Sequence, residues 1–260
     1  MASQDPSAGG SPSAGRLIVG ADLSGFAWDG ADLTDAVFEG CVIEDAQMSD
    51  VGLRGARFER CRLTRCRLAS SDLREAVFED CRFEDAERRQ GLALAFSRMD
   101  EARFRRCDLT LARFERCTMF GVELEDCNLR GARFAGADFS RVFGRKVVRI
   151  SAAFRGCNLE LAELADARLA GCELTRCDFR EADLSDADLE GADLSGGNLF
   201  GAILAGTKLA GADLRGAEVS GVDLAVLATR AGLRIAADQQ YRLLTALGVD
   251  VSVAQGAAGR

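Results

Sequence analysis

The stretch Ala182-Asp183-Leu184-Ser185-Asp186-Ala187-Asp188-Leu189-Glu190-Gly191-Ala192-Asp193-Leu194-Ser195-Gly196 repeats one five-residue unit three times. In each unit, a bulky apolar residue follows a small residue by two positions. The same pattern runs from Arg16 to Val226, with two interruptions. An internal repeat that fills most of a chain predicts a stacked solenoid, in which each unit buries its apolar side chains against its neighbours.

The five-residue period predicts an all-β coil with four flat sides. It matches neither an α-helix nor a plain strand, but it is satisfied if each unit is a short extended segment followed by a turn. Residues of like kind also recur every twenty positions, so four units make one coil. We predict two interior columns, and their members are Phe38, Phe58, Phe78, Met99, Met119, Phe139, Leu159 and Phe179 in the first and Leu33, Leu53, Leu73, Leu94, Phe114, Phe134 and Phe154 in the second.

The ten cysteines all occupy the small position of the unit, which alanine otherwise holds. This register predicts small buried hydrophobic side chains that stay reduced, and not a disulfide framework or a zinc site. The ten are Cys41, Cys61, Cys66, Cys81, Cys107, Cys117, Cys127, Cys157, Cys172 and Cys177.

Composition argues against catalysis and against binding nucleic acid directly. The 260 residues include 33 Lys and Arg, 41 Asp and Glu, and no histidine, which gives a formal charge of -8. A negative charge disfavours contact with nucleic acid, and the lack of histidine removes the commonest general base and metal ligand. We therefore expect no enzyme activity, no cofactor and no metal.

Three segments are expected along the chain. Residues 1–15 contain both prolines and few bulky side chains, so we expect a disordered tail. Residues 16–226 form the repeat body, and residues 227–260 a C-terminal cap. No apolar run is long enough to cross a membrane, and the N-terminus lacks the features of a signal peptide. We expect a cytoplasmic protein.

The C-terminal segment is expected to hold a helix and a strand. Asp238 is a plausible N-cap, and Gly248 a stop signal. Val249, Val251 and Val253 alternate with polar residues, which is typical of a strand. The segment either caps one rod or joins two copies, and the candidate dimerisation residues are Tyr241, Leu243, Leu244, Leu247, Val249 and Val251.

Two interruptions of the repeat are candidate contact regions, because function concentrates in irregular segments on rigid scaffolds. Residues 86–91 hold six positions where five belong, whereas residues 142–151 keep the count but lose two apolar positions. Counting faces from Ala21, we predict that both breaks project from the same side, about 14 Å apart. Their basic candidates for partner contact are Arg88, Arg89, Arg145 and Lys146.

Charge is distributed unevenly along the repeats. Residues 21–50 hold eight acids and no base, residues 51–116 hold sixteen arginines against twelve acids, and residues 181–193 hold six acids and no base. Acidic ends on a narrow rod would suit a protein groove that normally holds DNA. The acidic candidates for partner contact are Asp45, Asp85, Asp126 and Asp186.

The A-D-L-x-x unit resembles the pentapeptide-repeat family over about four-fifths of the chain. The resemblance implies a right-handed quadrilateral parallel β-helix. The layout as a whole is similar to the topoisomerase-protecting branch: Qnr-like, mycobacterial fluoroquinolone-resistance-like and albicidin-resistance-like proteins. That similarity implies a homodimeric DNA mimic that binds DNA gyrase or topoisomerase IV and relieves poisoning. The first break differs from the long loop of those proteins, since it adds only one residue to the repeat. The alternative is a structural or adaptor scaffold for another protein.

Overall fold

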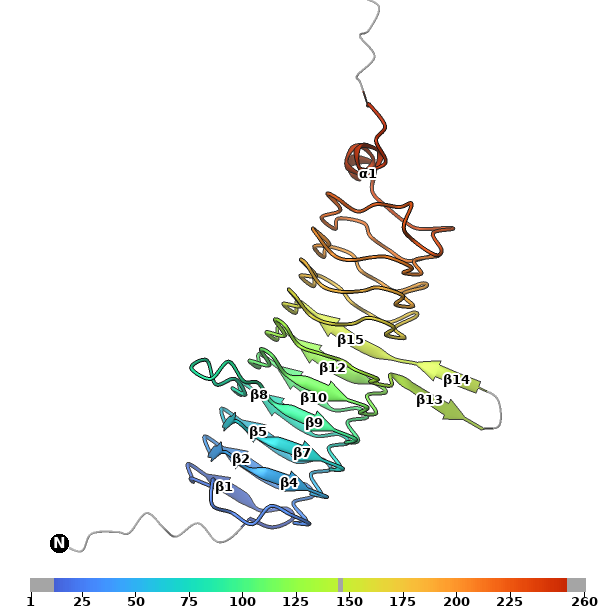
Figure 1. Cartoon of the computed structure of the whole chain (residues 1–260). Coiled ribbons are helices and arrows are strands. Elements are labelled where there is room, and N and C mark those ends of the chain that lie inside the picture. Colours follow the sequence, from blue (N-terminus) through green and yellow to red (C-terminus); the bar gives the residue numbers. More distant parts are fainter. Residues whose placement is uncertain (1–11, 145–146, 252–260) are drawn as a thin grey trace, which may run out of the picture.

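The apolar residue at the centre of each unit points into a right-handed quadrilateral parallel β-helix. The computed structural model describes residues 12–144 and 147–251, and its coils stack into an elongated rod (Figure 1). Strands on one side pair in parallel with a shift of twenty residues, as in Phe38 opposite Phe58. This pairing confirms four units per coil. No helix among the described residues is long and apolar enough to cross a bilayer.

The rod has four faces, and we name each face after one strand or residue that lies on it. The β1 face is a seven-stranded sheet, the β4 face is four-stranded, the β3 face contains two strands, and the Leu33 face is joined by isolated bridges such as Asp32–Gly52. The strands of the β1 face are β1 (Leu17–Val19), β2 (Val37–Glu39), β5 (Arg57–Glu59), β8 (Val77–Glu79), β10 (Arg103–Arg105), β12 (Val122–Glu125) and β15 (Ala152–Arg155). The others are β3 (Val42–Glu44) and β6 (Arg62–Thr64), with β4 (Gln47–Ser49), β7 (Arg67–Ala69), β9 (Ala93–Ala95) and β11 (Arg113–Glu115).

The phenylalanines of the β1 face stack ring on ring. Phe38 lies 4.6 Å from Phe58, and Phe58 lies 4.9 Å from Phe78, with rings inclined by only 8°. The next ring is Phe104, at 4.7 Å. The predicted continuation through Met99 is therefore wrong, because Phe78 and Phe104 are 26 residues apart and not 20. Six residues leave the coil at the first break, where the sequence suggested a one-residue bulge.

The second break also leaves the coil, as a β-hairpin. Strands β13 (Ser140–Phe143) and β14 (Val147–Ile150) pair antiparallel, and β12 pairs directly with β15 at a shift of thirty residues. We expected two altered units within the coil at this break. That expectation is wrong, because the ten extra residues leave the coil. Phe139 consequently lies on the Leu33 face and Phe179 on the β3 face, so the two are buried but belong to different columns.

The two extruded segments lie at opposite corners of the rod. The first follows Phe83 on the β3 face and ends at β9 on the β4 face; the second follows Phe139 on the Leu33 face and ends at β15. These corners are diagonal to each other, and Figure 1 shows the first segment leaving one side and β13–β14 the other. The prediction that both project from the same side is wrong, since it placed both segments within the coil.

The cysteines line the interior, as predicted. All ten are buried and free. Seven stack in one column beside the β3 face, and the thiols donate weak hydrogen bonds to carbonyl oxygens, as in Cys61 Sγ to Phe38 O at 3.3 Å. Burial raises the pKa of the Cys66 thiol to about 12, which keeps it protonated. The seven are Cys41, Cys61, Cys81, Cys107, Cys127, Cys157 and Cys177.

The described chain begins and ends packed against the ladder. Gly15 N donates to Thr34 O at 2.8 Å, so residues 13–15 already contact the coil, whereas residues 1–11 of the expected tail lie outside the described residues. At the other end the bridges continue past Val226 to Asp213–Arg234.

A short helical cap follows the last bridge. It consists of η1 (Ala237–Gln239) and α1 (Gln240–Ala246). Gln239, and not Asp238, performs the capping: its side chain accepts from Ala236 N and donates to Leu214 O and Ala217 O. These bonds close the open end of the ladder. Residues 249–251 do not form the predicted strand, and Val249 N instead donates to Leu244 O of the helix at 2.9 Å; Val253 lies outside the described residues.

Candidate protein-binding surface

The corners of the rod present side chains to solvent because their residues adopt left-handed backbone conformations. Asp45, Arg65, Asp126 and Asp186 have φ values between 51° and 58°, a region that aspartate tolerates better than most residues. At Asp186 the carboxylate reaches over the next coil, where a Cβ on Gly206 would lie 2.1 Å from its Oδ1. Among these corner residues, Asp45, Asp126 and Asp186 are exposed, whereas the Arg65 side chain is only 16% exposed.

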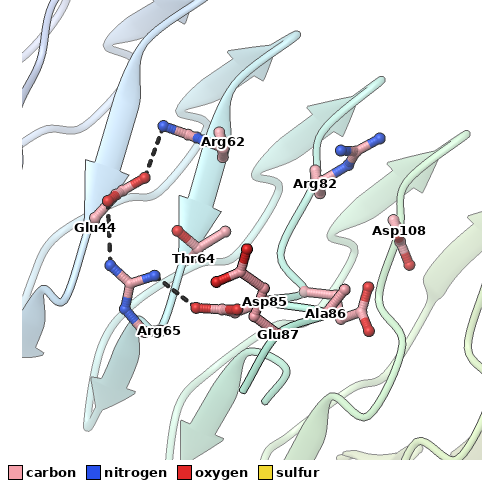
Figure 2. A pocket seen from close by; sticks show the side chains of 10 residues that line it. Glu44, Arg62, Thr64, Arg65, Arg82, Asp85, Ala86, Glu87 and Asp108 are labelled. Carbon is pink, nitrogen blue, oxygen red and sulfur yellow. Dashed lines mark hydrogen bonds and ion pairs between the residues drawn. The ribbon is translucent and has the colours of Figure 1, made fainter. Parts of the chain in front are cut away.

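Two of the four predicted acids are held by one arginine. Arg65 contacts Asp45 at 2.6 Å, Asp85 at 2.6 Å and Glu44 at 3.1 Å, and Figure 2 shows its guanidinium between Glu44 and Asp85. Hydrogen bonds from Arg65 lower the pKa of both aspartates and raise the pKa of Arg65 itself. This network ties three successive coils together, and it competes with any outside partner.

The other two predicted acids are exposed and lie on different corners. Asp126 follows the β1 face, and Asp186 follows the β4 face. Neither belongs to an ion pair within the described part of the chain. The four predicted acids thus do not form one surface, and only Asp126 and Asp186 are free of the Arg65 network.

The first extruded segment is a closed loop. Asp85 N donates to Gln90 O at 2.8 Å and Gln90 N to Asp85 O at 3.1 Å, and the Asp85 carboxylate accepts from Arg88 N. Arg88 and Arg89 extend from this base and are exposed. Beneath the loop is a groove of about 570 Å³ lined by both charges, including Arg62, Glu84 and Glu87 (Figure 2).

The second extruded segment is an apolar ribbon. Val142 pairs with Val148 and Phe143 with Val147, and their exposed fractions run from 40 to 65%. Phe143, the last residue of β13 before the turn, packs edge-on against Phe120 of the rod at 5.7 Å, which holds the hairpin against the rod. The predicted contacts Arg145 and Lys146 lie outside the described residues. The apolar residues were missed in the sequence, although valine and phenylalanine runs on either side of a glycine are a hairpin signal.

Unpaired acids gather at the N-terminal end of the rod and in residues 181–193, which lie about two coils before its C-terminal end. Ion pairs between neighbouring coils, such as Arg105–Glu125 at 2.9 Å, concentrate in the middle. Among the described residues, the acids of 21–50 and 181–193 that join no ion pair are Asp22, Asp29, Asp32, Asp35 and Asp50 in the first group and Glu181, Asp183, Asp186, Glu190 and Asp193 in the second. The middle of the body is therefore close to neutral, whereas its N-terminal end and the stretch 181–193 carry acids without ion-pair partners in the part of the chain that the structure describes.

The cap presents an apolar patch beside the end of the ladder. Leu243 is buried, whereas Tyr241, Leu244, Leu247, Val249 and Val251 are between 36 and 59% exposed. Of the predicted dimerisation residues, Leu243 therefore belongs to the cap of its own rod. The other five form the apolar patch.

Comparison with known structures supports the same architecture. A trypsin-treated form of QnrB1, a plasmid-mediated fluoroquinolone resistance protein, is 25% identical with a TM-score of 0.68 and covers 94% of this chain and 100% of that chain. Full-length QnrB1 is 24% identical with a TM-score of 0.64, covering 92% and 100%. No curated protein matched this sequence.

The repeats themselves match family models over most of the body. The pentapeptide-repeat models match residues 18–55, 52–87, 162–199 and 198–225 in one form and residues 100–142 in another. The unmatched stretches 88–99 and 143–161 include most of the two extruded segments. The chain belongs to the pentapeptide-repeat family.

Proposed function

We propose that this protein is a DNA mimic that binds DNA gyrase or topoisomerase IV in the cytoplasm and protects it from a topoisomerase poison. The observation that carries the proposal is a rod with unpaired acids at its N-terminal end and in residues 181–193, which matches a fluoroquinolone resistance protein over 94% of this chain. Acids spaced along a narrow rod can occupy a basic groove that otherwise holds DNA, and their attraction steers association. No catalytic step is needed, because occupying the groove excludes DNA.

The two extruded segments supply contacts of a second kind. Arg88 and Arg89 offer charge at one corner, and the Val142–Val148 ribbon offers apolar area at the opposite corner. An enzyme that encloses a rod from two sides would meet both. We therefore propose that the rod occupies the DNA-binding groove and that the two segments contact neighbouring domains of the enzyme.

The protection assay measures drug-stabilised cleavage of plasmid DNA by gyrase. Adding this protein should reduce the cleaved DNA formed with a fluoroquinolone and restore supercoiling, and the effect should weaken with added salt because screening weakens the contacts of exposed acids. If supercoiling in the presence of drug is unchanged at saturating protein, the scaffold or adaptor function replaces this proposal.

We further propose that two copies associate through the apolar patch of the cap. Five exposed apolar side chains around a seven-residue helix leave apolar area that a second copy would cover,. The double variant Tyr241→Ser, Leu244→Ser keeps Leu243 and Gln239, so the ladder stays capped. Light scattering should show a dimer for the parent and a monomer for the variant. A variant that remains dimeric would place the interface elsewhere.

A further inference from the structure

A second groove lies on the other side of the first extruded loop, and arginines dominate it. It has a volume of about 400 Å³ between the loop and the β4 face. Arg88 and Arg89 come from the loop, Arg113 and Arg133 come from the β4 face, and Gly91 and Gly131 also line it. No acidic residue lines it. We call it the arginine groove.

Three of the four arginines in the arginine groove form no ion pair among the described residues, although Arg88 is near enough to Asp45 and Asp85 to help lower the pKa of both carboxyls. Within residues 12–144 and 147–251, Arg88, Arg89 and Arg113 form no ion pair, although Arg113 is half-buried. Arg133 contacts Glu163 at 3.0 Å, and both side chains are more than half exposed, so that pair contributes little. Arg65, only one coil away from the loop, binds three carboxylates. Neighbouring acids thus neutralise Arg65, whereas most arginines of the arginine groove have no ion-pair partner among the described residues.

The fold holds these arginines together. Arg113 and Arg133 are direct partners on adjacent coils, so their side chains start about 4.8 Å apart, and like charges directly opposite each other are unfavourable. Gly91 fixes the loop from the other side, because a Cβ there would lie 2.3 Å from Thr110 O. Gly131 carries no side chain that could occupy the space. Four arginines thereby line one opening.

We propose that the arginine groove binds a phosphate group of a small molecule. A phosphomonoester carries about -1.5 to -2 charge and three strong acceptor oxygens, which suit several guanidinium forks; a single carboxylate would leave most of the positive charge unmatched. The volume falls within the range of small-molecule sites. Duplex DNA is disfavoured by the net charge of -8. This inference stands independently of the proposed topoisomerase function.

Calorimetric titration at constant ionic strength tests the site with three probes: inorganic phosphate, pyrophosphate and ATP without metal. The parent should bind at least one with a dissociation constant below about 1 mM. If phosphate binds as tightly as the others, the phosphate group is the whole ligand; tighter binding of pyrophosphate or ATP identifies a diphosphate or a nucleotide. Absence of saturable binding of all three overturns the proposal.

The double variant Arg88→Gln, Arg113→Gln locates the site. Its affinity should fall at least about tenfold, as expected for the loss of two charge-assisted contacts. Arg176→Gln removes an exposed corner arginine on another part of the rod and should bind like the parent. Thermal unfolding of each variant confirms that the fold is retained. Equal binding by the parent and the double variant, or an equal loss in Arg176→Gln, would contradict a site in this groove.

Discussion

The coils and the two extruded segments differ in how their side chains are satisfied. In the coils, apolar residues point inward and are almost fully buried, and many outward charges pair with the next coil, as Arg155 does with Glu173. In the segments, Arg88 and Arg89 have no ion pair among the described residues, and Val142 and Val148 remain exposed. The apolar side chains of the body are thus satisfied within the rod, whereas the segments carry both charged and apolar groups that a partner could satisfy.

The difference also explains why the stack tolerates the insertions. Pairing resumes in register on both sides of each segment: Phe78 meets Phe104, and Leu124 meets Phe154. Each segment begins and ends at one corner, so no interior column is interrupted. A solenoid held by contacts between neighbouring coils can accept such an extrusion at little cost.

The largest expected effect comes from the core of the body. Phe58→Ala removes a ring stacked between Phe38 and Phe78 and should lower the free energy of unfolding by about 3–5 kcal/mol. Val142→Ala on the exposed ribbon should change it by about 0.5 kcal/mol or less. Urea denaturation measures both. Similar losses in the two variants would mean that the ribbon is part of the core.

A smaller effect is expected from an ion pair in the body whose carboxylate is buried and whose arginine is exposed. Hydrogen bonds from Arg215 hold the pKa of the Asp213 carboxyl at about 2, below its ordinary 3.8, and its side chain is only 5% exposed. Because the folded-state pKa is the lower one, the stabilisation is complete above pH 4 and is lost as pH falls through 2.

Acid titration of the Asp213→Asn variant checks this assignment. At neutral pH the variant should melt at a lower temperature than the parent, because Arg215 loses its charged partner. The gap between their melting temperatures should shrink as the pH falls from 4 to 2. A gap independent of pH would assign the effect to packing and not to ionisation.

The smallest effect on stability is expected when either segment is removed. Deleting 86–91 leaves Asp85 at the corner and five residues from Phe83 to the next apolar centre, Leu94; deleting 141–150 leaves Ser151 at the corner and five residues from Phe139 to Phe154. Aspartate and serine already occupy such corners at Asp45 and Ser70. Both variants should therefore keep the circular dichroism and melting temperature of the parent within a few degrees. A collapse of either would show that the segment supports the stack.

The inward pattern of the body could be predicted from the sequence, and the neighbours across the breaks could not. Phe83 and Leu94 are eleven positions apart. That spacing fits either two units with a one-residue bulge or one unit with six residues outside the coil. Only spacing over whole coils separates the two cases, and the signal available was that Phe104 continues the series Phe38, Phe58, Phe78. The side from which each segment projects depends on that choice.

The candidate contact residues were less predictable for the same reason. Whether Asp45 is free depends on which residue lies above it, and that residue is Arg65, twenty positions away. Arg113 and Arg133 were not predicted as contact residues, because they occupy ordinary outward positions of the repeat. They form a groove only together with the loop. The apolar ribbon was recognisable locally, but the count of ten residues favoured two altered units.

Drug-stabilised cleavage by gyrase, measured with the parent and the two deletion variants side by side, tests the central claim most directly. We predict that the parent lowers the cleaved fraction, and that at least one deletion variant loses most of this protection while it keeps the fold. The parent and the deletion variants are compared at the same protein concentration, at which the parent should protect and the deletion variant should not. Protection by both variants equal to that of the parent would contradict the assignment of the segments as contacts, and no protection by the parent would contradict the proposed function itself.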